Sequence, residues 1–583
     1  MEILKGIPVS PGVYIGEAFL QESEEVRIPQ LYVLDELIED EVKRFEAAAA
    51  TVGGEIESIR NQTEEQLGAS LAAILMVQTQ LLKDESLRKQ ITDKIRHEKF
   101  SAEHAVATTL TNIAKRLAGR GDNLFAHRDS DIYDIQKRLL KLLLGSRGED
   151  LSHLERPVAV IAHDLGPSET ASLDRTKVKA FAIDVGGRTS HTAILARAFE
   201  MPAVVGLESI STDISGGETI IIDGNRGIVI LRPDERTLAR YRKLQAEFQS
   251  FEQALIKEKD LPAKTLDGRE ISVQANIEFP DEVQNALAHG AGGIGLFRTE
   301  FLYLTSGIIP DEHTHFEAYR KSLSRLNGRP LVIRTLDLGA DKIVPHHSLH
   351  ERNPFLGLRS IRVSMKYPET FRTQVRAILR ASALGKVRLM LPMITAIEEL
   401  RWARRIIDET RQELKREGHG FDEKIEVGIM IEVPSAALQA YSLAKEADFF
   451  SIGTNDLTQY TLAVDRGNEL VANLYSPANP AVLALIWMTV DAAARAGIPV
   501  SMCGEMAGDK IYTSLLLGMG LTELSISPPS IPEIKKIIRT VKYEKCKEIA
   551  EQVRAMTETS AILDFLRSRM GEDLPDGEKF GSS

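Results

Sequence analysis

The feature that most constrains the fold is a regular alternation of short apolar runs with longer amphipathic segments, which begins beyond Pro262. Short apolar runs bounded by turn residues are typical of buried strands, and the longer segments are typical of helices. Eight such units follow one another, which predicts a (β/α)8 TIM barrel. The eight predicted strands are Ile271–Ile277, Gly293–Phe297, Leu331–Leu336, Arg388–Met393, Val427–Ile431, Phe449–Gly453, Ile498–Met502 and Glu523–Ile526.

Before Pro262 the sequence pattern changes twice, from β-type to helical and back to β-type. Residues 1–20 place Gly and Pro between short β-type runs, whereas the stretch from Val33 to about Gly145 has few Gly or Pro and carries apolar residues at helical spacing. Strand-like runs then return at Val158–Ala162, Ala180–Ile183, Thr219–Asp223 and Gly227–Leu231. We therefore expect an α/β domain into which a helical bundle is inserted, so that the whole chain is an α/β multidomain protein.

These changes divide the chain into five parts. The charged, Gly-free stretch from Asp234 to Asp260 predicts a linker helix, because nothing in it stops a helix. The predicted parts are the α/β domain (1–20 and 148–232), the inserted helical bundle (21–147), the linker helix (233–261), the barrel (262–575) and a flexible tail (576–583).

Charge and cysteine content exclude several classes of protein. A net charge of −12 gives no reason to expect binding to nucleic acid or to an anionic membrane, so an anionic substrate would need a local cationic pocket. The chain has two cysteines, Cys503 and Cys546, which argues against a disulfide scaffold and suits a reducing compartment. Without a long apolar segment, the chain is expected to be cytoplasmic.

Polar side chains follow most of the predicted barrel strands, where barrel enzymes carry their catalytic groups. Carboxylates from two strands, Glu432 and Asp456, can hold a hard cation such as Mg²⁺. Arginines supply forked donors that match phosphate and carboxylate. The set predicts a site for a small phosphorylated acid, with a surface ion-pair network as the alternative. It comprises Arg298, Glu300, Arg334, Asp337, Lys342, Arg359, Glu432, Asn455, Asp456, Arg466, Cys503 and Glu505.

Two further residues each have a functional and a structural interpretation. Cys503 follows the seventh strand and is equally compatible with chemistry at the barrel mouth and with packing as a small hydrophobe. His191 lies in Gly186-Gly187-Arg188-Thr189-Ser190-His191-Thr192, a Gly-rich turn before a predicted helix, where backbone N–H groups can receive a phosphoryl group. A lone histidine more often caps a helix or packs against its neighbours than takes part in catalysis.

One glycine pattern does not indicate a nucleotide site. Gly290–Gly295 satisfies the G-x-G-x-x-G pattern but precedes a strand, whereas the dinucleotide fingerprint follows a strand and opens a helix. The chain also contains no G-x-x-x-x-G-K-[ST] phosphate loop.

Long motifs in order give the chain a family resemblance over nearly its whole length. It closely resembles Enzyme I of the bacterial sugar phosphotransferase system, a family of phosphoenolpyruvate (PEP)-utilizing enzymes. The motifs are Gly6–Gly12, Gly186–Arg197, Gly293–Leu302, Asn353–Arg362, Gly428–Pro434, Ser451–Gly467 and Met502–Gly508.

The resemblance implies a role for each motif residue. His191 would be phosphorylated from PEP, with Thr170 and Arg188 nearby, and Cys503 would protonate the enolate to release pyruvate. Glu432 and Asp456 would hold Mg²⁺. The residues implied to bind PEP are Arg298, Arg334, Arg359, Asn455 and Arg466, with Lys342 and Glu505 in support.

The resemblance also implies partners. The acceptor would be the histidine phosphocarrier protein (HPr), docked on the helical insertion through Arg128, Met76 and Leu81, and the chain would form a homodimer through the barrel. Because His191 and the barrel site lie on different domains, the histidine domain would have to move between donor and acceptor. The sequence departs from the family at Ile74–Gln78 in the docking helix and at Ala340.

Three rival functions share part of this pattern. A pyruvate phosphate dikinase or PEP synthase would need a nucleotide-binding domain before the swivel domain, and a nitrogen-regulatory Enzyme I would carry an added N-terminal sensory domain. A catalytically inactive scaffold that only binds the phosphocarrier is the third. The set of His191, Glu432, Asp456 and Cys503 favours the active enzyme over the scaffold.

Overall fold

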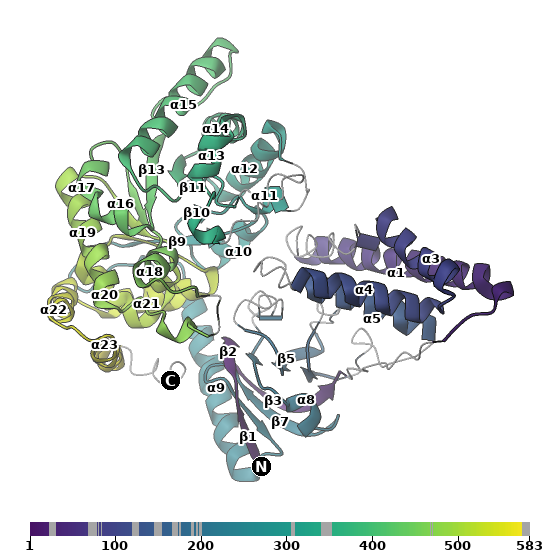
Figure 1. Cartoon of the computed structure of the whole chain (residues 1–583). Helices are drawn as coiled ribbons and strands as arrows, with labels where there is room; N and C mark the ends of the chain where they lie inside the picture. The colour runs from purple at the N-terminus through teal and green to yellow at the C-terminus, as the bar shows by residue number, and fades with distance from the viewer. Residues whose placement is uncertain are drawn as a thin grey trace. The chain divides into compact units, whose positions relative to one another are not determined.

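The computed structural model of the chain is shown in Figure 1. It describes residues 1–583 with gaps at 22–30, 68–78, 80, 83, 119–127, 145–153, 155, 166–172, 174–175, 188–191, 194–195, 197–200, 305–308, 340–352, 467, 469 and 574–583. The described chain forms two compact units, Met1–Glu252 and a second that begins at Gln253. Among the described helices, none combines the length and apolar character needed to cross a membrane.

The first unit contains an eight-stranded sheet built from both sides of the helical insertion. Strands β3 and β4 are parallel neighbours that place Glu17 opposite Val158. This pairing confirms that the strands before and after the insertion share one sheet. In the order β1-β8-β7-β3-β4-β5-β6-β2, the strands are β1 (Glu2–Lys5), β8 (Ile228–Leu231), β7 (Thr219–Asp223), β3 (Val13–Leu20), β4 (Val158–Ala162), β5 (Val178–Ile183), β6 (Ala203–Val205) and β2 (Ile7–Ser10).

Apolar residues cover both faces of this sheet. On β4, Val160 packs with Phe181 on one face, while its neighbour Ile161 packs with Ile222 on the other. Successive side chains of a strand point to opposite faces, so a strand buried on both sides must be apolar throughout. Two short elements were not predicted from the sequence: β6, a three-residue strand, and the helix α8 (Ile210–Asp213).

The described part of the helical insertion contains α1 (Ile38–Leu67), α3 (Glu85–Glu98), α4 (Ala102–Ala118) and α5 (Arg128–Leu144), preceded by a 3-10 turn at Asp35–Leu37. Its core is formed by apolar residues at helical spacing, such as Ile91 and Ile95 on α3 and Ile135 and Leu139 on α5. Asp84 accepts a hydrogen bond from the Ser86 N–H and so caps the start of α3.

Helix α9 (Glu235–Glu258) occupies the stretch for which a linker helix was predicted. Its first half packs on the sheet of the first unit, where Leu238 and Tyr241 join the cluster of Val13 and Ile221. Gln245 lies on the same face and donates to the Val13 carbonyl at 2.9 Å. Helix α9 therefore packs on the sheet although its apolar content is low. Leu238, Tyr241 and Gln245 are spaced three and four residues apart, so they lie on one face of the helix and are enough to dock it.

The second unit contains a closed barrel of eight parallel strands, which confirms the predicted fold class. The barrel closes where β16 pairs with β9. Every predicted strand coincides with an observed strand to within a few residues. The strands are β9 (Ser272–Ile277), β10 (Ile294–Phe297), β11 (Leu331–Arg334), β12 (Val387–Leu391), β13 (Glu426–Ile431), β14 (Phe450–Ile452), β15 (Val500–Met502) and β16 (Glu523–Ile526).

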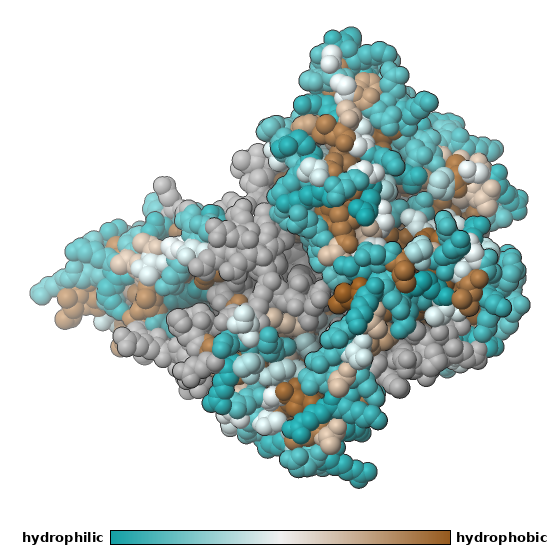
Figure 2. All heavy atoms as spheres, turned by 180° about the vertical axis from the view of Figure 1, so that it is seen from behind, coloured by the Kyte–Doolittle hydropathy of each residue, from teal (hydrophilic) through white to brown (hydrophobic). Residues whose placement is uncertain are grey.

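Helices surround the barrel (Figure 1), and further helices follow its last strand in the sequence. On the face shown in Figure 2 hydrophilic residues dominate the surface, as expected when the helices turn their apolar sides toward the strands. The helices are α10 (Glu282–Ala288), α11 (Phe301–Leu304), α12 (Glu312–Leu326), α13 (Ile361–Lys366), α14 (Pro368–Ser382), α15 (Ile397–Arg416), α16 (Pro434–Leu438), α17 (Ala440–Leu443), α18 (Thr454–Leu462), α19 (Pro480–Ala496), α20 (Thr513–Met519), α21 (Ile531–Thr540), α22 (Tyr543–Arg554) and α23 (Thr559–Asp573).

Candidate active site at the mouth of the barrel

The carboxyl ends of five barrel strands carry the polar residues that the sequence singled out. Parallel strands end at the same rim of a barrel, so residues far apart in sequence meet there. Arg298 follows β10, Arg334 ends β11, Glu432 follows β13, Asp456 lies in the first turn of α18 after β14, and Cys503 follows β15.

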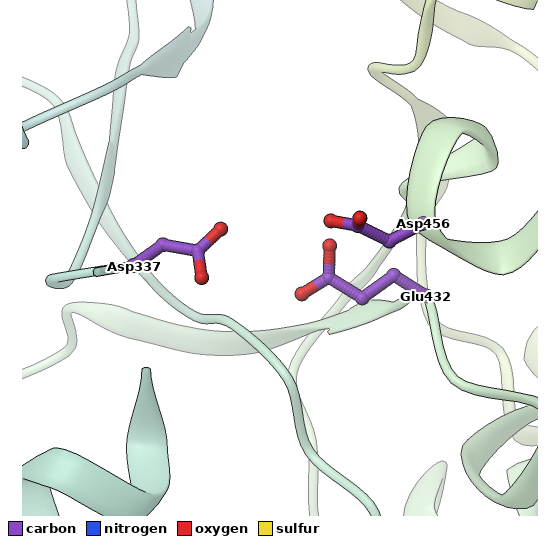
Figure 3. A group of neighbouring side chains, drawn as sticks. All are labelled: Asp337, Glu432 and Asp456. Atoms are coloured by element: carbon purple, nitrogen blue, oxygen red, sulfur yellow. The ribbon is translucent and has the colours of Figure 1, made fainter. Parts of the chain in front are cut away.

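Three carboxylates face one another at this rim (Figure 3). Asp337, Glu432 and Asp456 each offer an oxygen, and these oxygens lie within 4.8 Å of one another. Oxygen ligands from two or three carboxylates suit a hard divalent cation. The sequence had placed Asp337 after the third strand without giving it a role; its position three residues beyond Arg334 at a strand end was the available signal.

Glu432 is the most buried member of this acidic cluster, with 1% of its surface exposed. Its Oε1 accepts a hydrogen bond from the Met393 N–H at 2.6 Å. A methyl group at Gly453 would lie 3.0 Å from Oε2, so glycine there keeps the space beside that oxygen open. Burial, together with the neighbouring carboxylates of Asp337 and Asp456, raises the pKa of Glu432 to about 8. A cation among these oxygens would offset the repulsion between the three carboxylates. The three oxygen donors therefore suit a bound cation.

Asp337 differs from the other two carboxylates because two arginines already neutralise it. Arg334 Nη1 and Arg359 Nη2 each lie 3.0 Å from a different oxygen of Asp337, and the Ser360 hydroxyl donates to the oxygen that faces Arg359. Although burial acts to raise it, the pKa of Asp337 is held below its usual range by the two guanidinium groups. Asp337 therefore positions the arginines, which leaves Glu432 and Asp456 as the candidate cation ligands.

Asp337→Asn is expected to lower the free energy of unfolding of the barrel by about 3 kcal/mol, because it leaves two buried guanidinium groups without their shared counter-charge. The two tryptophans of the chain, Trp402 and Trp487, both lie in the second unit. Tryptophan fluorescence during urea denaturation therefore reports on the barrel.

Asp281→Asn is the matched control, because Asp281 also pairs with two cations, Lys321 and Arg325, but in a partly exposed position. Its replacement should cost about 1 kcal/mol or less. Equal losses in the two variants would contradict the positioning role of Asp337.

A second group at the rim joins Asn455, Glu505 and Arg466. The Glu505 N–H donates to Asn455 Oδ1 at 2.9 Å, and Asn455 Nδ2 and Arg466 Nη1 each lie 3.2 Å from Glu505 Oε1. Arg298 pairs in the same way with Glu278 at 2.6 Å. Because Glu278 and Glu505 are both more than half exposed, these pairs contribute little, and an anionic substrate can take the place of either carboxylate.

Cys503 is buried, and its environment combines the two interpretations that the sequence left open. It packs inside the barrel with Leu296, Met390 and Met430, as a small hydrophobe would. Its thiol also donates to the Ile452 carbonyl at 3.7 Å. Burial raises the pKa of the thiol to about 11, and the nearby Glu432 carboxylate adds to the effect. The thiol is therefore protonated at neutral pH, and it can act as an acid.

Several predicted site residues lie outside the described part of the chain. These are His191, Arg188, Thr170, Lys342 and Met76, together with the Ile74–Gln78 and Ala340 departures. Of the other predicted docking residues, Arg128 is the first residue of α5, and Leu81 packs partly buried against the helical core.

Comparison with protein families gives the class to which this fold and site belong. The family described as "PEP-utilising enzyme, PEP-binding domain" matches residues 252–543, which contain the barrel and its rim. The N-terminal and mobile domains of the PEP-utilising enzymes match residues 5–128 and 154–227. The barrel with its ring of arginines and carboxylates is thus the PEP-binding domain of this class.

Individual relatives match up to 97% of this chain in the cases that follow. A phosphoenolpyruvate-protein phosphotransferase of Bacillus sp. (strain S) is 42% identical over 97% of this chain and 97% of its own length. One of Haemophilus influenzae is 42% identical over 97% of this chain and 98% of its own. A solution structure of Enzyme I (nEIt) is 37% identical, covers 42% of this chain and 99% of that one, and has a TM-score of 0.38. The chain belongs to the phosphoenolpyruvate-protein phosphotransferase family, and the predicted resemblance is confirmed.

Proposed function

We propose that this chain takes the phosphoryl group of PEP onto His191, releases pyruvate, and passes the phosphoryl group to HPr in the first step of sugar uptake by the phosphotransferase system. The observation that supports this most directly is the rim of the barrel, where buried arginines and a carboxylate cluster face one another. Membership of the family supports PEP as the donor and a phosphocarrier protein as the acceptor.

The arginines of the rim would bind the two anionic groups of PEP. Arg334 and Arg359 are held rigidly by Asp337, so their remaining donors are aimed before the substrate arrives. Arg298, Asn455 and Arg466 would exchange their exposed carboxylate partners for the substrate. Preorganised donors of this kind stabilise developing charge without having to reorganise.

The chemical step requires one nitrogen, one leaving group and one proton donor. A neutral ring nitrogen of His191 would form the bond to phosphorus while the bond from phosphorus to the enol oxygen breaks, and the electron pair leaves with the enolate. The methylene carbon of the enolate would then take the proton of the Cys503 thiol to give pyruvate. Because burial raises the thiol pKa to about 11, a thiolate formed in this step would recover its proton from water at neutral pH.

Glu432 and Asp456 would hold Mg²⁺ beside the bound phosphate, in keeping with the oxygen-only donor set. When bound, this ion supplies positive charge against the transferring phosphoryl group and the enolate oxygen. Burial of Glu432 would keep water away from that charge.

The resemblance also supports the remaining partner assignments. HPr would dock on the helical insertion, and two chains would associate through the barrel. A nitrogen-regulatory relay is not favoured, because relatives at 40–42% identity over 97% of the chain or more carry the name phosphoenolpyruvate-protein phosphotransferase, without a nitrogen-specific designation.

Incubation with ³²P-labelled PEP and Mg²⁺ tests the proposal. We expect the chain to acquire a label that is labile in acid and stable in alkali, as phosphohistidine is, and to lose it when HPr is added. A chain that takes no label would contradict the enzymatic function and favour the scaffold. A label that HPr does not remove would contradict the assignment of the acceptor.

A further inference from the structure

We infer that a buried chain of hydrogen bonds running from His315 through Tyr319 and Gln374 holds the end of β11 in place and so positions Arg334 for PEP. The inference rests on the proposed function for the role of Arg334. It assigns positioning roles to residues of α12 and α14, which lie outside the rim itself.

The chain ends on the backbone at both sides of Thr335. The hydroxyl of Thr299 donates to the carbonyl of Arg334 at 3.0 Å, and the N–H of Leu336 donates to Gln374 Oε1, also at 3.0 Å. Gln374 Nε2 donates to Thr299 Oγ1 at 3.0 Å and links the two contacts. One amide side chain thus fixes the two backbone groups that flank the end of the strand.

The same contacts reach the loop after β10. Thr299 lies between Arg298 and Glu300, and Glu300 accepts hydrogen bonds from both the Arg334 guanidinium and the Asp337 N–H. Arg334 is therefore fixed at its guanidinium by Glu300 and Asp337 and at its backbone carbonyl by Thr299. Gln374 in turn holds Thr299 and the N–H of Leu336. Small displacements of a substrate-binding group cost catalysis heavily, which makes support at both ends effective.

The side-chain donors of the chain lead away from Gln374 in two directions, toward Thr299 and toward Tyr319. Gln374 Nε2 has two hydrogens, one for Thr299 and one for the Tyr319 hydroxyl oxygen at 3.2 Å. Tyr319 can then give its own proton to His315 Nδ1 at 3.1 Å, and the N–H at His315 Nε2 faces the Tyr303 hydroxyl at 3.3 Å. Complete pairing requires a neutral His315 with its proton on Nε2.

Burial makes this arrangement rigid and keeps it neutral. Thr299, His315 and Tyr319 have no exposed surface and Gln374 has 1%, so a broken link would leave an unpaired polar group away from water. Burial lowers the pKa of His315 to about 4 and raises that of Tyr319. Both side chains therefore stay uncharged at neutral pH.

Tyr319→Phe tests the inference, because it removes one oxygen and keeps the ring. We expect the KM for PEP in the labelling reaction to rise about tenfold with kcat changed less, since Arg334 would lose part of its binding geometry in both the ground and transition states. Ser322→Ala is the matched control: Ser322 is equally buried on the same helix, but among the described residues its hydroxyl bonds only to the Ala318 carbonyl. It should leave the KM unchanged.

His315→Gln and His315→Leu provide a second test if Tyr319→Phe does not fold. Glutamine keeps an acceptor and a donor and should retain a KM near that of the wild type, whereas leucine should behave like Tyr319→Phe. Nitrogen NMR of ¹⁵N-histidine-labelled protein, with the His315 signal assigned by its loss in His315→Gln, should show the proton on Nε2.

Three outcomes would overturn the inference. The first is a KM for PEP that stays unchanged in Tyr319→Phe or in His315→Leu although thermal stability falls. The second is a proton on Nδ1 of His315, and the third is a charged His315 at neutral pH. Absence of PEP-dependent labelling in the wild-type chain is a separate result. It would overturn the proposed function and, with it, the role given to this hydrogen-bond chain.

Discussion

Glu432→Gln is expected to reduce the rate of PEP-dependent labelling by about a thousandfold, since loss of a cation ligand removes several kcal/mol of transition-state stabilisation. The same change should not lower the thermal midpoint of the barrel in the presence of a chelator. Glutamine can still accept the hydrogen bond of the Met393 N–H, and it carries no charge that would repel the other two carboxylates. Loss of activity without loss of stability distinguishes a ligand from a structural residue.

Glu426→Gln is the matched control for this experiment. Glu426 begins the same strand, β13, at the opposite end of the barrel, where it pairs with Arg388. Its replacement should leave labelling within about twofold of the wild type, because Glu426 lies at the end of the barrel away from the rim that would bind substrate. Initial rates over a range of Mg²⁺ concentrations make the comparison. A Glu432→Gln chain that kept the wild-type rate and the wild-type Mg²⁺ dependence would contradict the proposed role of the acidic cluster.

The barrel could be predicted from sequence because its strands are short apolar runs separated by helix-length segments, a pattern that follows from burial of every strand. The rim was predictable for a related reason. Once the strands are located, Glu432, Asp456 and Cys503 follow their ends, and the topology alone brings those ends together.

The contacts of Asp337 could not be predicted in the same way. That it binds two arginines at once depends on the register of β11 and on the turn that places Arg359 beside Gly339. The hydrogen-bond chain was missed for a different reason. His315, Tyr319 and Gln374 lie inside helices, where a buried polar residue in an amphipathic pattern cannot be told from one on the exposed face until the helix is docked.

Helix α9 illustrates the same limit. Its charged sequence predicts a helix that only links two domains. Tyr241 is nevertheless almost fully buried against the sheet of the first unit. A single aromatic residue can bury enough apolar area to dock one face of a helix while average composition stays polar.

Replacing His191 with alanine is expected to abolish the labelling of the chain by PEP, because no other group in the proposed mechanism accepts the phosphoryl group. The structure describes Gly186 and Ala193, which lie on either side of residues 188–191 in the sequence. Gly186 has a φ of +107°, which favours glycine in the turn after β5, and Ala193 is buried in the core of the sheet. Strand β5 pairs in parallel with β4 and β6, and α/β sheets bind their ligands at the carboxyl edge of such strands.

His163→Ala is the discriminating control, because residues 154–227, which match the mobile domain, contain two histidines, His163 and His191. His163 follows β4 at the same edge, and its Nδ1 lies 3.3 Å from the buried carboxylate of Asp184. It is about half exposed, so it is the histidine most easily mistaken for the acceptor. We expect His163→Ala to label like the wild type in acid-lability and in amount. An acid-labile label that survived in His191→Ala and disappeared in His163→Ala would move the phosphorylation site to His163.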